Sequence, residues 1–168
     1  MEEQLLKQLI EILKKEYQEY EKLLSLAEQK KESLIENDVD RLSNLIDTEE
    51  EVLTTISDYD NQRDKLVYTL SQELEIDHQE INYSELIDHI PEEWVKKLEP
   101  VRDKLLTIID ELHTINESNK MLIDEAIKLN NLTYKTIAQI VNPDNRNYNP
   151  DQDNKSDNST THIIDRKA

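Results

Sequence analysis

Two histidines in this chain follow an acid by three residues, a spacing with which helical di-iron proteins hold metal. They are His78 after Glu75 and His113 after Asp110. Residues at i and i+3 face the same side of a helix and can share an ion. A di-iron bundle also needs inward glutamates from two further helices, and it uses glutamate where Asp110 stands. Since 38 acids make chance pairs common, we favour surface charge over a di-metal carboxylate bundle and expect no metal.

The chain contains no glycine and no cysteine in 168 residues. Glycine builds the dinucleotide-binding and phosphate-binding loops and the nucleophile elbow, and cysteine builds zinc fingers and disulfide frameworks. The sequence also offers no nucleophile beside a matching base. We therefore predict a protein that is not an enzyme and that needs no cofactor.

The net charge is −18, and the sequence pI is about 4.5. Such a chain is repelled by a phosphate backbone and by an anionic membrane, so nucleic acid is excluded as an expected partner. The acidic start lacks a signal-peptide apolar region, and no apolar run approaches the ~20 residues of a membrane span. We expect a cytoplasmic protein without membrane insertion.

Three stretches carry the heptad spacing of apolar residues that indicates long helices, at about 3–36, 42–70 and 101–140. The first pattern breaks at Asn37 and Asp38. Asparagine tolerates the left-handed conformation at a helix end, and aspartate is a good N-cap, so a tight reversal is predicted there. The fold class is all-α: an elongated antiparallel helical hairpin or coiled-coil-like bundle of about three long helices with a disordered C-terminal tail.

Charged residues occupy seam positions of the first two stripes. If the chain reverses at residues 37–38, Glu16 comes near Arg63, and Lys30 or Lys31 comes near Glu49. Paired seam charges fix the register of two helices at some cost in stability. The alternative is that each side chain extends to water.

The segment 75–99 is less regular. Ser84 is a candidate cap for a short helix that ends before Pro91, and Pro100 is expected to start or kink the next helix. Residues 142–168 are polar and rich in asparagine, and we expect them to be disordered in isolation. The expected organisation is a helical bundle at 1–141 followed by a polar tail at 142–168.

The third stripe has a second apolar edge beside it, so its apolar face over 119–141 is wider than one packing partner requires. This surplus predicts a surface for another helix. It fits either a bound partner or a structural coiled coil in which two copies of the chain pair as a homodimer.

The first two stripes together resemble the FlgN family of flagellar export chaperones. Asn37-Asp38 and the segment 119–126 also match that family, and Tyr148-Asn149-Pro150-Asp151 is similar to its tyrosine-containing tail motif, without the glycines usual there. The other positions that carry the resemblance are Leu9, Glu16, Tyr20, Leu23, Leu24, Ser25, Leu26, Ala27, Lys30, Leu34, Leu42, Glu49, Glu50, Leu53, Ile56 and Arg63.

The resemblance implies a cytoplasmic chaperone of type III flagellar export. Such a chaperone binds the C-terminal helical segment of the hook–filament junction proteins FlgK and FlgL, prevents premature assembly and delivers them to the export gate component FlhA. It also makes Tyr148 a candidate for docking at that gate. By carry-over, the partner-binding positions are Asn119, Leu122, Ile123, Ala126, Ile127, Leu129, Asn130, Thr133 and Ile137.

Overall fold

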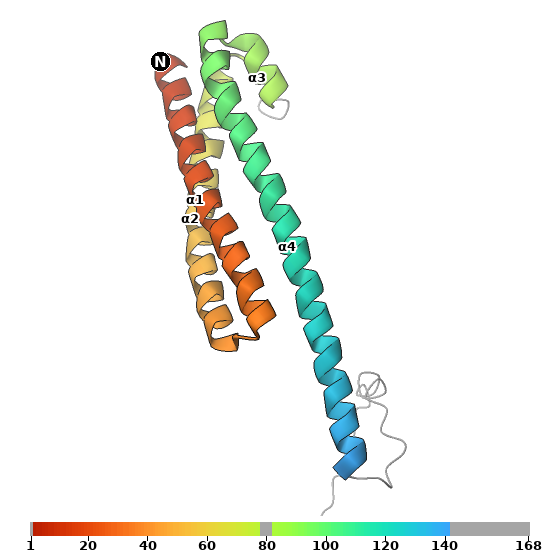
Figure 1. Cartoon of the computed structure of the whole chain (residues 1–168). Helices are drawn as coiled ribbons and strands as arrows, with labels where there is room; N and C mark the ends of the chain where they lie inside the picture. Colours follow the sequence, from red (N-terminus) through yellow and green to blue (C-terminus); the bar gives the residue numbers. More distant parts are fainter. Residues whose placement is uncertain (1, 78–81, 142–168) are drawn as a thin grey trace, which may run out of the picture. The chain divides into compact units, whose positions relative to one another are not determined.

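The computed structural model describes residues 2–77 and 82–141, which contain four α-helices and no strand (Figure 1). The chain divides into two compact units, Met1–Glu125 and Ala126–Ala168. The helices are α1 (Glu2–Glu36), α2 (Val39–Glu73), α3 (Tyr83–His89) and α4 (Glu92–Val141). The all-α class is confirmed. The expected boundary between 141 and 142 stays a prediction, because residues 142–168 lie outside the described part.

The described residues form four helices where the sequence predicts about three long ones: the fourth is the short helix α3, which ends before Pro91 as expected, and α4 starts earlier than expected. Asn82, rather than Ser84, caps α3, because its side chain accepts a hydrogen bond from the Glu85 N–H at 3.1 Å. Helix α4 begins directly after Pro91, whose carbonyl accepts from the Trp94 N–H at 2.8 Å. Proline has a fixed φ that suits a helix start, so Pro91 takes the role expected of Pro100.

Pro100 lies inside α4 and on an exposed position. A proline in a helix removes the hydrogen bond to the carbonyl four residues earlier, here that of exposed Lys96. The helix nevertheless continues through Pro100 to Val141.

The reversal between α1 and α2 is the one that the sequence predicts. Asn37 has a φ of 57°, in the left-handed region. The Asp38 N–H donates to the Ser33 carbonyl at 2.9 Å and the Asn37 N–H to the Leu34 carbonyl at 3.3 Å, which is a Schellman ending. The Asp38 side chain then accepts from the Arg41 N–H at 2.9 Å and caps α2.

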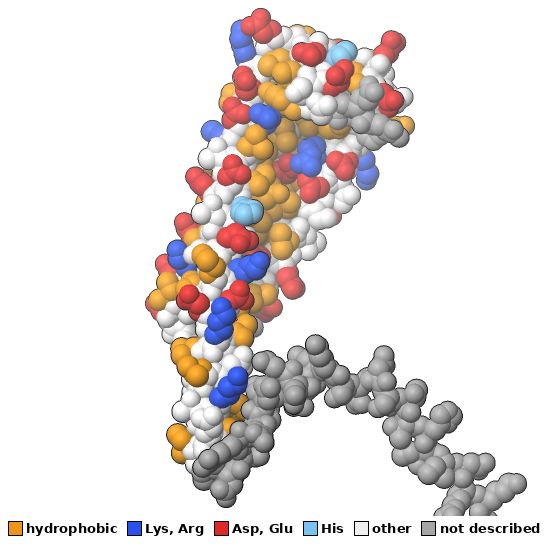
Figure 2. All heavy atoms as spheres, turned by 90° about the vertical axis from the view of Figure 1, so that its right-hand side faces the viewer, with side chains coloured by type: hydrophobic (Ala, Val, Ile, Leu, Met, Phe, Trp, Pro, Cys, Tyr) orange, Lys and Arg blue, Asp and Glu red, His pale blue; other side chains and the backbone are white. Residues whose placement is uncertain are grey.

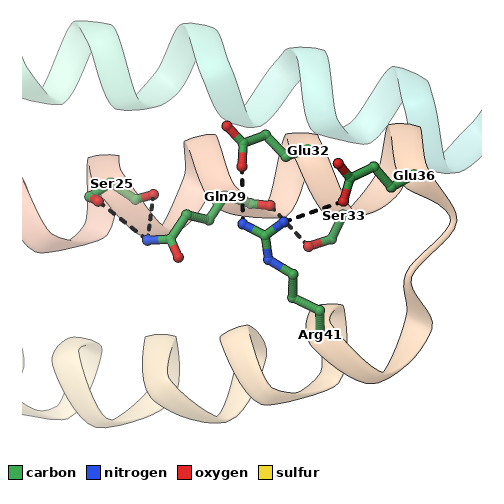
Figure 3. Close-up of polar contacts among 6 residues, drawn as sticks. All are labelled: Ser25, Gln29, Glu32, Ser33, Glu36 and Arg41. Carbon is green, nitrogen blue, oxygen red and sulfur yellow. Dashed lines mark hydrogen bonds and ion pairs between the residues drawn. The ribbon is translucent and has the colours of Figure 1, made fainter.

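The Arg41 side chain also links the start of α2 to the end of α1. Its guanidinium lies between the carboxylates of Glu32 and Glu36 on α1, at 3.0 and 3.4 Å (Figure 3). Arg41 is therefore tied to the end of α1 by its side chain and to Asp38 by its backbone. The same residue fixes both the turn and the packing of the two helices beside it.

Helix α2 ends in a second left-handed residue, and this one is a glutamate. Glu75 has a φ of 56°, and the Ile76 N–H closes the turn on the Ser71 carbonyl at 3.0 Å. A residue with a Cβ carries a cost of roughly 1 kcal/mol in this region, which asparagine tolerates better than glutamate does. The chain thus uses its helix-ending conformation twice, once with a suited residue and once without.

The apolar core of the 1–125 unit lies at the end of the hairpin away from the Asn37 turn. There α1 and the end of α2 pack against α3 and the start of α4 (Figure 1). Burying a leucine-sized side chain contributes about 1.5–3 kcal/mol, so this cluster holds the three long helices together. Its buried members are Leu5, Leu6, Leu9, Ile10, Leu70, Leu86, Ile90, Trp94 and Leu98.

Candidate partner-binding surfaces

The seam of α1 and α2 contains the two ion pairs that the sequence predicts. The Arg63 guanidinium donates to both carboxylate oxygens of Glu16, at 2.8 and 2.7 Å. Lys30 pairs with Glu49, so of the two lysines offered by the sequence it is Lys30 that lies in the seam. The residue numbers of both pairs have the same sum, which means that both belong to one antiparallel register.

Glu16 is almost fully buried, with a relative exposure of 1%. Burial raises the pKa of its carboxyl, and the neighbouring Arg63 opposes this only in part. Arg63 is itself partly desolvated, but the carboxylates of Glu16 and Asp60 raise its pKa, and Asp60 accepts from it at 2.8 Å. The carboxylate of Glu16 is thus buried, and Arg63 is the one cation that pairs with it among the described residues. The arrangement sets register rather than chemistry.

The acid-x-x-His pattern does not form a metal centre in the part of the chain that the structure describes. No group of three or more histidines or carboxylates that could hold a metal ion is present among residues 2–77 and 82–141. His78 lies outside the described residues, so the pair that it makes with Glu75 stays untested. Glu75 is the left-handed residue at the end of α2, where it serves the turn.

Asn119 anchors α4 to α1 within the 1–125 unit. Its side-chain amide donates to the Ala27 carbonyl at 2.8 Å, and its relative exposure is 5%. The Asn119 Oδ1 atom is buried and has no hydrogen-bond partner among the described residues. A buried amide with one satisfied end fixes the register of packed helices, as a single polar residue does in a coiled-coil seam.

After Asn119, the apolar side chains of the same unit are more exposed than Leu105 and Ile108, which lie before it. Leu122 is half-buried, and Ile123 is 41% exposed. Leu105 and Ile108, in contrast, are buried. The apolar stripe of α4 therefore continues past Asn119 while its burial decreases.

The second unit begins at Ala126, and its helical part, residues 126–141, has no buried side chain. Ile127 is 52% exposed and Ile137 is 54% exposed. The partner-binding positions predicted in this stretch, which are Ala126, Ile127, Leu129, Asn130, Thr133 and Ile137, are all exposed. The structure adds further exposed apolar residues that the predicted set omits: Leu132, Tyr134, Ile140 and Val141.

Because a helix advances about 100° per residue, the apolar side chains of residues 126–141 cover roughly two thirds of its circumference. Polar residues form the remaining strip, with Lys128 and Lys135 at its centre and no acid in the stretch. Thr133 and Thr136 donate their hydroxyls to the carbonyls four residues earlier, each at 2.9 Å, so their methyl groups extend the apolar face. Two of the omitted residues had a sequence signal: Leu132 lies on the second apolar edge, and Ile140 lies on the main stripe.

The described residues thus form a helical protein with a paired seam and an uncovered apolar helix face, the kind of surface that amphipathic helices bind. The chain is a member of the FlgN family: the family model described as FlgN protein matches residues 1–156. Membership supports a general role as a flagellar export chaperone, and this is a family of chaperones and not of enzymes. Among curated proteins and solved structures, nothing matches the chain.

No helix in the described residues is long and apolar enough to cross a membrane. Tyr148, the candidate for docking at the export gate, lies outside the described residues. Its role stays a prediction from the resemblance of the tail motif.

Proposed function

We propose that this protein is a cytoplasmic chaperone that holds the C-terminal helical segment of the hook–filament junction proteins FlgK and FlgL. The observation that carries the proposal is the uncovered apolar face of residues 126–141, together with membership of the FlgN family. An amphipathic helix buries its apolar stripe against such a face and so removes both surfaces from water. While it is bound, the segment is unable to assemble with other subunits, and the complex then passes to the export gate component FlhA.

The proposed binding positions are Leu122 and Ile123 in the first unit and, in the second unit, the predicted positions from Ala126 to Ile137. Asn119, also a predicted partner-binding position, lies in the same stripe of α4 as Ile123, but it is buried and anchors α4 to α1. Asn130 is a polar residue on an otherwise apolar side, so we propose that it sets the register of the bound helix. The bundle at 1–141 and the tail at 142–168, with Tyr148, complete the proposal as the binding domain and the gate contact.

A matched pair of variants tests the face. Ile137→Asp places a charge on the apolar side of the stretch, whereas Gln139→Asp places the same charge on its polar strip. We expect Ile137→Asp to weaken binding of a synthetic FlgK C-terminal peptide by roughly 30-fold or more in calorimetric titration, because a buried charge replaces an apolar contact. Gln139→Asp should change it less than about threefold.

Ile123→Asp extends the test into the first unit and should also weaken binding of the peptide. Circular dichroism of each variant controls for folding. If the peptide binds Ile137→Asp and Ile123→Asp as tightly as it binds the original chain, then this face is not the binding site.

The rival function is a structural coiled coil in which the same face pairs two copies of the chain. Its support is that the same apolar face is also self-complementary in character. Sedimentation equilibrium separates the two functions: a chaperone gives one chain per bound peptide, whereas a tight dimer that ignores the peptide favours the rival. A Tyr148→Ala variant that still binds peptide and loses capture by FlhA supports the proposed role of the tail.

A further inference from the structure

A second apolar surface lies wholly within the 1–125 unit, at a groove bordered by α1, α2, the start of α3 and the first part of α4. Its volume is about 570 Å³. Figure 2 shows apolar side chains gathered in a hollow of this unit, with acidic and basic side chains along its edges. The apolar lining includes Leu13, Val67, Leu106 and Ile109.

The exposed apolar side chains of α4 make this groove an incomplete core. Leu106 is 46% exposed and Ile109 is 38% exposed, although the neighbouring Leu105 and Ile108 are buried. The lining residues of α4 extend from Leu98 to Ile109, a length of roughly 16 Å at 1.5 Å per residue. Three turns of a further helix therefore fit along it.

The charges around the groove decide what kind of helix it accepts. Both arginines that line it are engaged: Arg63 with Glu16 and Asp60, and Arg102 with Asp103 at 3.1 Å and with the Tyr83 ring at 4.2 Å. Asp64 also lines the groove and is exposed.

Asp64 forms no ion pair with any residue that the structure describes. The local field is therefore anionic, as is the field of the whole chain at a net charge of −18. A cationic partner lowers the energy of this field, whereas an acidic one raises it.

We propose that this groove binds an amphipathic helix of a partner protein that carries lysine or arginine beside its apolar stripe. Its apolar residues cover Leu13, Leu106 and Ile109, and its cation pairs with Asp64. The groove shares no residue with the face proposed for the junction-protein segment, so the proposal gives the chain two helix-binding surfaces with different charge preferences. The stretch at 126–141 has two lysines and no acid, whereas the groove has an unpaired acid.

The probe for this proposal is a fluorescein-labelled synthetic helix of about 18 residues, with a leucine stripe flanked by lysines. Its counterpart has glutamate in place of every lysine. Fluorescence anisotropy with the full chain should show the lysine peptide binding roughly tenfold or more tightly than the glutamate peptide. Equal binding of the two peptides overturns the charge assignment.

Matched variants locate the site. Ile109→Asp should weaken the lysine peptide by about tenfold, whereas Leu53→Asp, at an exposed apolar residue of α2 that does not line the groove, should leave it unchanged. Asp64→Lys should also weaken it about tenfold, whereas Asp47→Lys, with the same change in net charge at an exposed position, should not. Equal effects within either pair refute the site.

Two further results would overturn the proposal. If Ile137→Asp, rather than Ile109→Asp, abolishes binding of the lysine peptide, then the peptide binds the stretch at 126–141 and not the groove. If sedimentation shows that the original chain is a dimer and that Ile109→Asp is a monomer, then the groove is occupied by a second copy of the chain. Because Asp64 and Asp47 are both exposed, their variants fold and keep the test decisive even if Ile109→Asp unfolds.

Discussion

One helix, α4, contains two stretches of similar apolar content that have opposite environments. In residues 92–119 four apolar side chains are buried, with Trp94, Leu98, Leu105 and Ile108 all below 9% exposed. In residues 126–141 no side chain is buried. An apolar heptad pattern therefore predicts a helix and a contact, but not whether the contact is made within the chain. The first stretch supports the fold, and the second is free to support binding.

The largest effect is expected when the same substitution, leucine to alanine, is made in each of the two stretches and the free energies of unfolding are compared. Leu98 is 3% exposed and Leu129 is 64% exposed, and both lie on α4. Leu98→Ala should lower the free energy of unfolding by about 2–5 kcal/mol, because it leaves a cavity in the core. Leu129→Ala should change it by less than about 0.5 kcal/mol. Urea unfolding followed by circular dichroism measures both, and equal losses would show that residue 129 is packed in solution.

A smaller effect concerns the buried charge in the packed unit. Arg63→Met leaves Glu16 buried without its donor and should cost roughly 2–3 kcal/mol, a value reduced because Arg63 is itself a third exposed. Adding Glu16→Met should restore most of that stability, since an apolar pair of similar size replaces the ion pair. Urea unfolding of the two single variants and the double variant gives the coupling energy. Strictly additive losses would mean that the two side chains do not interact.

The strain in the packed unit can be relieved without touching the exposed stretch. Glu75→Gly should raise the free energy of unfolding by about 1 kcal/mol, because glycine adopts the left-handed conformation freely. Asn37→Gly, at the other left-handed position, should gain clearly less, since asparagine already tolerates it. Thermal unfolding compares the two. Peptide binding by the exposed stretch should stay unchanged in both, and an equal gain at the two sites would contradict the argument.

The smallest effect is a pH dependence that only the packed unit should show. The pKa of Glu16 is raised in the folded state, so the proton binds more tightly there than in the unfolded chain. Its contribution to stability is therefore full below the unfolded pKa of about 4.5 and is lost as the pH rises through the folded value. Relative to Glu16→Gln, which does not titrate, the original chain should lose stability as the pH rises from about 4.5. A constant difference between the two would show that the pKa is not raised.

Prediction from the sequence is most accurate where one local feature determines geometry. The position of Asn37 and Asp38 fixes the turn, and the turn fixes which seam charges meet, so the pairs of Glu16 with Arg63 and Lys30 with Glu49 follow. It is least accurate where several residues could play the same part. Both Pro91 and Pro100 suit a helix start, and both Asn82 and Ser84 suit an N-cap, so residue type alone does not select between them.

The surfaces divide in the same way. The exposed face of residues 126–141 was predictable because its apolar arc is too wide for one seam. The groove beside Ile109 was not, because it depends on the spacing between α2 and α4, which no periodicity encodes. The left-handed Glu75 opposes its own conformational preference, so no residue-level signal indicates it. Asn119 is polar within the stripe, but its bond to the Ala27 carbonyl exists only once α1 lies beside it.

The two ion pairs in the α1–α2 seam have a consequence for how the chain can change in evolution. Glu16 and Lys30 are separated on α1 by the same number of residues as Glu49 and Arg63 on α2, and that number is a whole number of heptads. Deleting one residue between the pairs on either helix breaks one of them and rotates half of the seam out of contact. Length changes in this segment are therefore tolerated only when both helices gain or lose matching heptads, so related chains should differ there by substitution and vary in length outside the two pairs.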